Sequence, residues 1–147
     1  MYRNILLPTD GSPLSRKAIA AGIRLAKSTG ARVTGFHAAP PATPLEYRGI
    51  FPVGYADPVE RAKDIETMAA RHLEVVARAA KAAGVSCRVQ HETSDFPADA
   101  IVAAAKRNRC DLIFISSHGR HGFKPSLLGS QTQKVLAKSP IPVLVHR

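Results

Sequence analysis

Five short runs of apolar residues recur along the chain and predict the strands of a sheet. They cover residues 3–8, 32–38, 85–91, 111–117 and 141–146. The first, fourth and fifth runs are almost unbroken, as in strands that are buried on both faces of a parallel sheet. The second and third runs mix polar and apolar positions, so we expect these two strands to lie nearer an edge.

The segments between the strands carry apolar residues at helical spacing and predict four helices. We expect them over residues 14–27, over residues 59–83, around residues 98–105 and over residues 130–138. Ser12 followed by Pro13 is a good start signal, because serine caps a helix and proline suits its first position. Gly30 is expected to end this first helix. The third helix is expected to start from Ser94 or Asp95.

The alternation of strands and helices predicts an α/β fold with a doubly wound parallel sheet in one domain, residues 1–147. One connection breaks the rhythm, since residues 39–58 contain five prolines with three aromatic residues between them. Connections of this length are usually functional or mobile. An interaction surface, or a loop that packs its own aromatic residues, fits this segment better than a lid over a ligand.

The composition narrows the class of protein. No stretch of the 147 residues approaches the length of a membrane span, and no signal-peptide core precedes the first strand, so we expect a cytoplasmic protein without a membrane partner. The net charge of +10 favours polyanions. However, the 21 Lys and Arg residues are scattered, no nucleic-acid-binding signature is present and aromatic residues make up 5%, which argues against a nucleic-acid partner. Most of this charge is expected to be solvated surface.

Two of the predicted strands end in residues that can bind a ligand. The first is followed by Asp10, and the fourth by a loop with Gly119, Gly129 and Ser130. If the two strands are neighbours where the winding reverses, both loops face one crevice. Glycines let backbone N–H groups approach a phosphate, and the following helix adds partial positive charge at its start. Gly119, Gly129, Ser130 and also Thr132 would then face phosphates.

Each of these residues has a second interpretation. Asp10 can accept a hydrogen bond from a base or a ribose hydroxyl, but Thr-Asp-Gly-Ser is equally strong turn chemistry. Gly129-Ser130 can be a simple helix cap, and Ser130 can both cap the helix and bind a ligand.

The chain resembles the universal stress protein family over essentially its whole length. The resemblance rests on the Pro-Thr-Asp-Gly-Ser segment after the first strand, the proline-rich loop, the long second helix and the signature Ser-His-Gly-x9-Gly-Ser near the C-terminus. It implies a three-layer α/β/α fold, with a five-stranded parallel sheet in the order 3-2-1-4-5. The crevice would then lie between the first and fourth strands.

The resemblance also implies a ligand, ATP or another adenine nucleotide. ATP-binding members of the family carry Gly-x2-Gly-x9-Gly-Ser/Thr, and in this chain Ser116 stands at the first glycine. Its Cβ and hydroxyl occupy a place where backbone comes close to the ligand, so we expect weakened rather than abolished binding. The resemblance puts further residues around the nucleotide: Pro8 and Thr9 with Asp10 on the adenine side, Ala38 and Ile115 against the base, and Gln131 and Thr132 along the phosphates.

The nine-residue spacer of the signature is basic. His118, just before it, and Arg120, His121 and Lys124 within it can pair with phosphate oxygens, although an exposed basic loop is the better interpretation for His121 and Lys124. No carboxylate or cysteine accompanies the histidines, so we expect no metal site built from protein ligands there. An Mg²⁺ ion would arrive with the nucleotide and be held by phosphates and waters.

The resemblance implies a nucleotide-dependent regulator in the stress response rather than a fast enzyme. The Walker motif is absent, no catalytic residue is assigned, and slow ATP hydrolysis is the most that we expect. Family members commonly form homodimers through the fifth strand, which here begins at Ile141 and ends at His146. The alternative is a nucleotide-independent adaptor that recruits a partner through the proline-rich loop or the basic surface.

Overall fold

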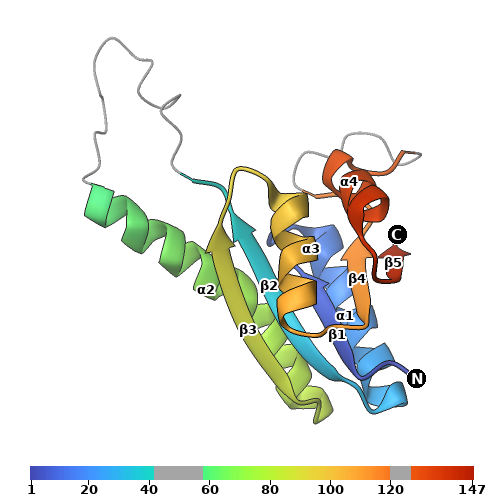
Figure 1. Cartoon of the computed structure of the whole chain (residues 1–147). Coiled ribbons are helices and arrows are strands. Elements are labelled where there is room, and N and C mark those ends of the chain that lie inside the picture. The colour runs from blue at the N-terminus through green and yellow to red at the C-terminus, as the bar shows by residue number, and fades with distance from the viewer. Residues whose placement is uncertain (42–57, 120–126) are drawn as a thin grey trace.

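A computed structural model describes residues 1–41, 58–119 and 127–147 of the chain. The proline-rich segment 42–57 and the spacer 120–126, with Arg120, His121 and Lys124, lie outside the described residues. Strands and helices alternate in the described part (Figure 1). In chain order they are β1 (Asn4–Pro8), α1 (Pro13–Thr29), β2 (Arg32–Ala39), α2 (Pro58–Ala83), β3 (Cys87–Thr93), α3 (Pro97–Arg107), β4 (Leu112–Ser116), α4 (Ser130–Lys138) and β5 (Val143–His146).

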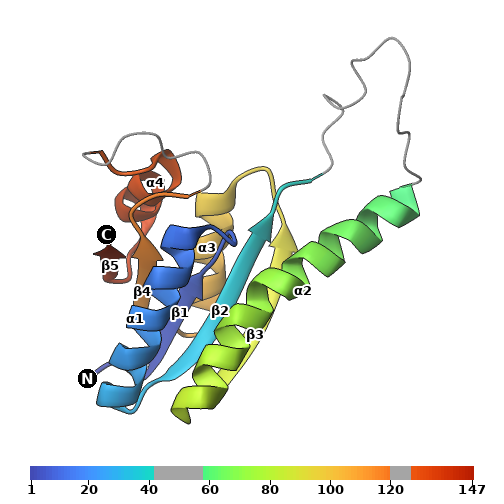
Figure 2. The same cartoon turned by 180° about the vertical axis from the view of Figure 1, so that it is seen from behind.

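The sheet is parallel and has the order β3-β2-β1-β4-β5, as the resemblance implied. Helices α3 and α4 cover one face (Figure 1), and α1 and α2 cover the other (Figure 2). Each face has its own apolar core. Ile5, Leu7 and Phe114 pack with α1 and α2, while Leu6 and Ile113 pack with α3 and α4. The predicted α/β/α architecture is therefore confirmed.

Local signals account for most element boundaries. Ser12 caps α1 by accepting a hydrogen bond from the N–H of Ser15, and Gly30 ends this helix with a φ of 72°. Strand β3 starts two residues later than predicted. Val85 still takes part in the C-terminal turn of α2, because its N–H donates a hydrogen bond to the carbonyl of Ala80.

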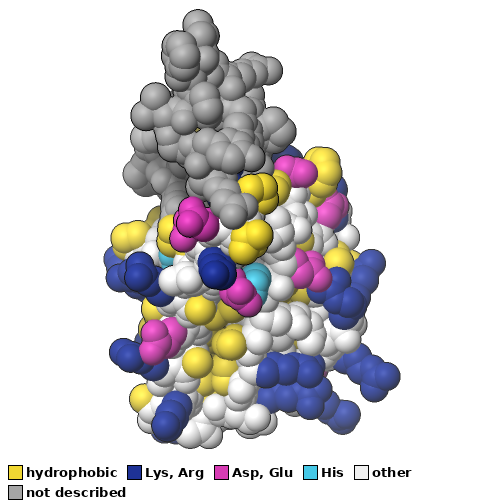
Figure 3. Space-filling model, turned by 90° about the vertical axis from the view of Figure 1, so that its left-hand side faces the viewer, with side chains coloured by type: hydrophobic (Ala, Val, Ile, Leu, Met, Phe, Trp, Pro, Cys, Tyr) yellow, Lys and Arg dark blue, Asp and Glu magenta, His cyan; other side chains and the backbone are white. Residues whose placement is uncertain are grey.

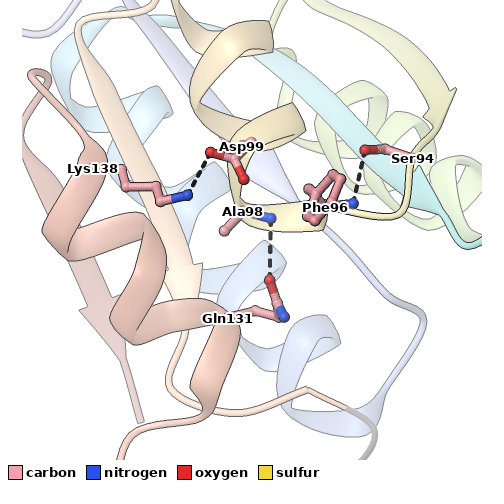
Figure 4. Close-up of polar contacts among 6 residues, drawn as sticks. All are labelled: Ser94, Phe96, Ala98, Asp99, Gln131 and Lys138. Carbon is pink, nitrogen blue, oxygen red and sulfur yellow. Dashed lines mark hydrogen bonds and ion pairs between the residues drawn. The ribbon is translucent and has the colours of Figure 1, made fainter.

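The predicted start of α3 was wrong. Pro97 is the first residue of the helix, and the capping position is occupied by Phe96, which makes no side-chain capping bond. The hydroxyl of Ser94 instead accepts a hydrogen bond from the N–H of Phe96, forming a local turn before the helix (Figure 4).

The prediction of which strands lie near an edge was half wrong. Strand β3 is an edge strand, but β2 is an interior strand between β3 and β1, and β5 forms the other edge. The polar residues of β2 misled the prediction because they are buried with partners: Thr34 donates to Asn4 Oδ1, and His37 Nδ1 lies 2.7 Å from the carbonyl oxygen of Thr9. Strand β5 is mostly half-buried despite its apolar sequence.

Within the described part of the chain, every helix is too short or too polar to cross a membrane.

Candidate functional site

A cavity lies at the carboxyl ends of β1, β2 and β4, where the winding of the sheet reverses. It has a volume of about 590 Å³ and is called the cavity below. The reversal arises because β1 is paired with β2 on one side and with β4 on the other. Eleven of the twelve residues predicted to bind a nucleotide line it: Pro8, Thr9, Asp10, Ala38, Ile115, Ser116, Gly119, Gly129, Ser130, Gln131 and Thr132.

The loop after β1 is held by short-range hydrogen bonds. Asp10 Oδ1 accepts from the N–H of Ser12 at 2.9 Å, so the carboxylate does form the turn that its sequence suggested. Its other oxygen faces the loop after β4, because a Cβ added to Gly119 would lie 2.5 Å from Asp10 Oδ2. Asp10 therefore braces the turn and lines the cavity at the same time, and the two interpretations of its role are compatible.

The loop after β4 is fixed from within. The hydroxyl of Ser116 donates to the carbonyl of His118 at 2.9 Å, and the carbonyl of Ser116 accepts from the hydroxyl of Thr132. Ser117 Oγ lies 3.0 Å from His118 Nδ1. These contacts turn the His118 ring into the loop, and His118 is the one predicted residue that does not line the cavity. The pairing of His118 with phosphate oxygens stays a prediction.

Gly129 allows the chain to return close to this loop. Its N–H donates to the carbonyl of Ser117 at 2.7 Å, and an added Cβ would lie 3.2 Å from both Ser117 O and His118 Cα. A side chain there would have to push backbone atoms apart. The glycine thus permits the close approach that brings the start of α4 to the cavity.

The start of α4 is not capped by any side chain within the described residues. Gly129, not Ser130, occupies the capping position, which corrects the prediction that Ser130 serves as the cap. The first N–H groups of a helix lack partners inside the helix and carry partial positive charge. Ser130, Gln131 and Thr132 of this first turn all line the cavity. Such a helix start suits an anion.

Two side chains of this turn already have partners. Thr132 Oγ1 donates to the Ser116 carbonyl, and Gln131 Oε1 accepts from the N–H of Ala98 at 3.2 Å (Figure 4). Gln131 thereby supplies α3 with the cap that Phe96 does not provide. An ion pair also joins α3 and α4, since Lys138 Nζ lies 2.7 Å from Asp99 Oδ1.

The far wall of the cavity comes from α2 and was missed by the sequence analysis. Ile65, Met68 and His72 line it, together with Asp64 and with His37 of β2. The His37 and His72 rings meet edge to face, with centroids 4.9 Å apart, and a Cβ at Gly11 would overlap the His72 ring. The two histidines pack against each other at the cavity wall. The helical spacing of His72 with the buried Val76 gave no sign that it lines a cavity.

No group of three or more potential metal ligands occurs within residues 1–41, 58–119 and 127–147.

Comparisons with known proteins place the chain among similar sequences and folds. A model described as "Universal stress protein family" matches residues 1–147. The protein named "Universal stress protein in QAH/OAS sulfhydrylase 3'region" from Thermus aquaticus is 32% identical over 147 residues and covers 100% of both chains. Universal stress protein YxiE of Bacillus subtilis is 30% identical, again over 100% of both chains. Among solved structures, MJ0577 of Methanocaldococcus jannaschii superposes with a TM-score of 0.80 at 26% identity, over 99% of this chain and 95% of that one.

Three other structures of the same fold are described with bound nucleotides. A universal stress protein in complex with cAMP has a TM-score of 0.74 at 22% identity, covering 99% of this chain and 97% of that chain. The protein from Archaeoglobus fulgidus in complex with dAMP gives 0.65 at 18%, over 99% and 98%. The Arabidopsis thaliana protein with AMP bound gives 0.67 at 18%, over 97% and 90%.

Proposed function

The chain belongs to the universal stress protein family, and from this premise we propose that its cavity binds an adenine nucleotide. The observation that carries the proposal is the position of the cavity, at the reversal between β1 and β4 and against the uncapped start of α4. Its volume of about 590 Å³ lies within the range of small-molecule sites. The cAMP, dAMP and AMP complexes of proteins with this fold support the choice of ligand class.

In this proposal the base lies at the ends of β1 and β2. Pro8, Ala38 and Ile115 offer apolar surface there, and Phe36 and Ile101 extend it. A flat heterocycle gains free energy by leaving water for such a surface. Asp10 supplies the nearest acceptor in the β1 loop for an amino group or a ribose hydroxyl.

The phosphate is proposed to lie at the first turn of α4. Gly119 and Gly129 leave room for it, and the backbone N–H groups that follow Gly129 are the donors. The Ser130 side chain is an additional donor, whereas the hydroxyl of Thr132 is already bound to Ser116. ATP with Mg²⁺ is one candidate ligand, the metal being held by phosphates and waters rather than by a protein cage.

Family membership supports a wider proposal about the role of binding. We propose a cytoplasmic regulator of the stress response whose state depends on the nucleotide.

A homodimer through β5 fits the geometry, because β5 is an edge strand with Leu144 37% exposed, and Leu136 on the adjacent α4 is 42% exposed. An edge strand left open would be a template for unwanted pairing. Analytical ultracentrifugation of the wild type and of Leu144→Lys tests this assembly; a monomer at micromolar concentration would rule it out.

Calorimetric titration tests the nucleotide proposal. AMP, cAMP, Mg-ATP and GTP are titrated at about 0.3 M salt, where loose charge attraction is screened. Saturable binding of adenine nucleotides is expected, and it should be lost in Gly119→Val, whose side chain would displace the Asp10 carboxylate. Ala82→Val, on the exposed surface of α2, introduces the same valine side chain away from the cavity, and this variant should bind normally. The proposal would be rejected if the wild type gave the same binding heat with GTP as with the adenine nucleotides and Gly119→Val bound AMP as well as the wild type. Absence of any binding heat in the wild type would also reject it. Either result would favour a nucleotide-independent adaptor.

A further inference from the structure

The end of the sheet opposite the cavity gathers positive charge that is dispersed in the sequence. Arg3, Arg32, Arg88 and Arg109 lie just before or at the start of β1, β2, β3 and β4. Lys27, Lys81 and Lys106 lie in the last turns of α1, α2 and α3. Because the strands are parallel and each helix returns the chain between them, all seven reach the same end, which we call the basic end. Figure 3 shows Lys and Arg side chains gathered low on one side of it.

The backbone positions of the four arginines form a row across the sheet. The strand order puts Arg88, Arg32, Arg3 and Arg109 one after another, over three strand intervals of about 4.8 Å each. The backbone N–H of Arg32 donates to the carbonyl of Arg3 at 3.0 Å, which joins two neighbouring positions of the row. The Arg88 side chain reaches across the sheet, since its Nη2 lies 3.5 Å from the carbonyl of Asn108, the residue before Arg109. All four are exposed.

Little negative charge opposes this row. Asp111 lies beside it, but its two oxygens accept hydrogen bonds from the N–H groups of Arg3 and Asn4. Within the described residues, no ion pair joins any of the seven basic side chains to a carboxylate. Asp10 and Asp64, by contrast, line the cavity at the other end. Seven of the 21 Lys and Arg residues therefore lie at the end of the sheet opposite the proposed nucleotide site.

Helix electrostatics explain only part of the arrangement. Lysines in the last turn of a helix complement its negative end, and Lys27, Lys81 and Lys106 fit this rule. The rule concerns helix ends, so it does not account for four arginines at strand starts. A row of guanidinium groups, each able to bind phosphate through two N–H donors, suits an extended chain of phosphates.

We propose that the basic end binds the phosphate backbone of a nucleic acid without reading its sequence. Aromatic side chains for stacking bases are not among the residues of the basic end, and Tyr2 next to it packs against the core. A bilayer fits less well. The large apolar side chains exposed there are Met1 and Val89, which form no amphipathic helical face. The expected interaction is therefore electrostatic, independent of sequence and steeply weakened by salt.

The test uses fluorescence anisotropy with a labelled 20-base-pair duplex at several salt concentrations between 50 and 200 mM. The triple variant Arg32→Gln, Arg88→Gln, Arg109→Gln removes three charges from the row. The matched control Arg16→Gln, Lys17→Gln, Lys134→Gln removes three exposed charges from α1 and α4, so both proteins carry +7 instead of +10 (10 minus 3). Circular dichroism and thermal melts verify folding of both.

The wild type should bind two unrelated duplex sequences equally. The row variant should bind at least about tenfold more weakly at 100 mM salt, and its slope of log K against log salt should be shallower by up to about 2.7, or 0.9 for each lost contact. The control should keep most of the affinity and slope. AMP binding should be unchanged in the row variant, which separates this proposal from the nucleotide site.

Absence of wild-type binding to the duplex at 50 mM salt would overturn the proposal, as would an equal loss of duplex affinity in both variants. Row-dependent binding to phosphatidylserine vesicles without binding to the duplex would also overturn it.

Discussion

Replacing Ser116 with glycine should have opposite effects on folding stability and on nucleotide affinity. The Ser116 hydroxyl donates to the His118 carbonyl at 2.9 Å, and the residue is buried. Loss of this hydrogen bond costs about 1 kcal/mol of stability, and the added backbone freedom of glycine costs about 0.5–1 kcal/mol more. A total of about 2 kcal/mol lowers the midpoint of thermal unfolding by about 4–8 °C in a protein of this size.

The same change should improve binding, because it removes a side chain from the cavity wall and restores the first glycine of the family motif. A gain of about 1.4 kcal/mol corresponds to about tenfold tighter binding of AMP. Scanning calorimetry measures the stability, and isothermal titration with AMP measures the affinity.

Ser117→Gly is the matched control. Ser117 is equally buried, its hydroxyl contacts His118 Nδ1 at 3.0 Å, and it does not line the cavity. This control should lose comparable stability with no change in affinity. If Ser116→Gly leaves the affinity unchanged or lowers it while folding normally, the side chain of Ser116 does not obstruct the ligand and the reasoning from the motif is wrong.

Three further predictions concern single residues. Gln131→Ala should lower stability by about 1 kcal/mol in urea titrations because the N–H of Ala98 loses its acceptor, whereas Gln131→Glu should keep the stability yet weaken nucleotide binding by charge repulsion. Asn4→Ala should cost about 3 kcal/mol, since the buried amide accepts from Thr34 and donates to a backbone carbonyl; a loss below about 1 kcal/mol would contradict this. Burial raises the pKa of the Cys110 thiol above its ordinary value, so folding favours the protonated form. The resulting stability is present below the pKa of the thiol in the unfolded chain and is lost as the pH rises through its pKa in the folded protein. Iodoacetamide should modify this thiol far more slowly than a free cysteine.

Most of the fold could be predicted from the sequence because hydrophobic period and capping residues act locally. Ser12 and Gly30 bound α1 as expected. The order of strands in a sheet is a long-range property, and the apolar run of β5 gave no indication that it forms an edge. The polar residues of β2 were misleading for a related reason: a buried Thr34 is tolerated because Asn4 of the neighbouring strand satisfies it.

The cavity was predictable where its residues follow strand ends and less so elsewhere. Parallel strands bring Asp10 and Gly119 to one edge, so a chain-order argument finds them. The contact of the His118 ring with Ser117 could not be read from the sequence, since it depends on the folded loop. The α2 wall around Met68 and the arginine row of the basic end both depend on how separate elements pack side by side, and no local pattern in the sequence encodes that.

The measurement that tests adenine nucleotide binding most directly is a two-dimensional ¹H–¹⁵N NMR titration of the protein with AMP. Binding in the cavity predicts saturable shifts of the amide signals of Gly119, Gly129 and Ser130, with little change at Arg32 and Arg88. Shifts confined to the basic end, or no saturable shifts at millimolar AMP, would contradict the proposed site.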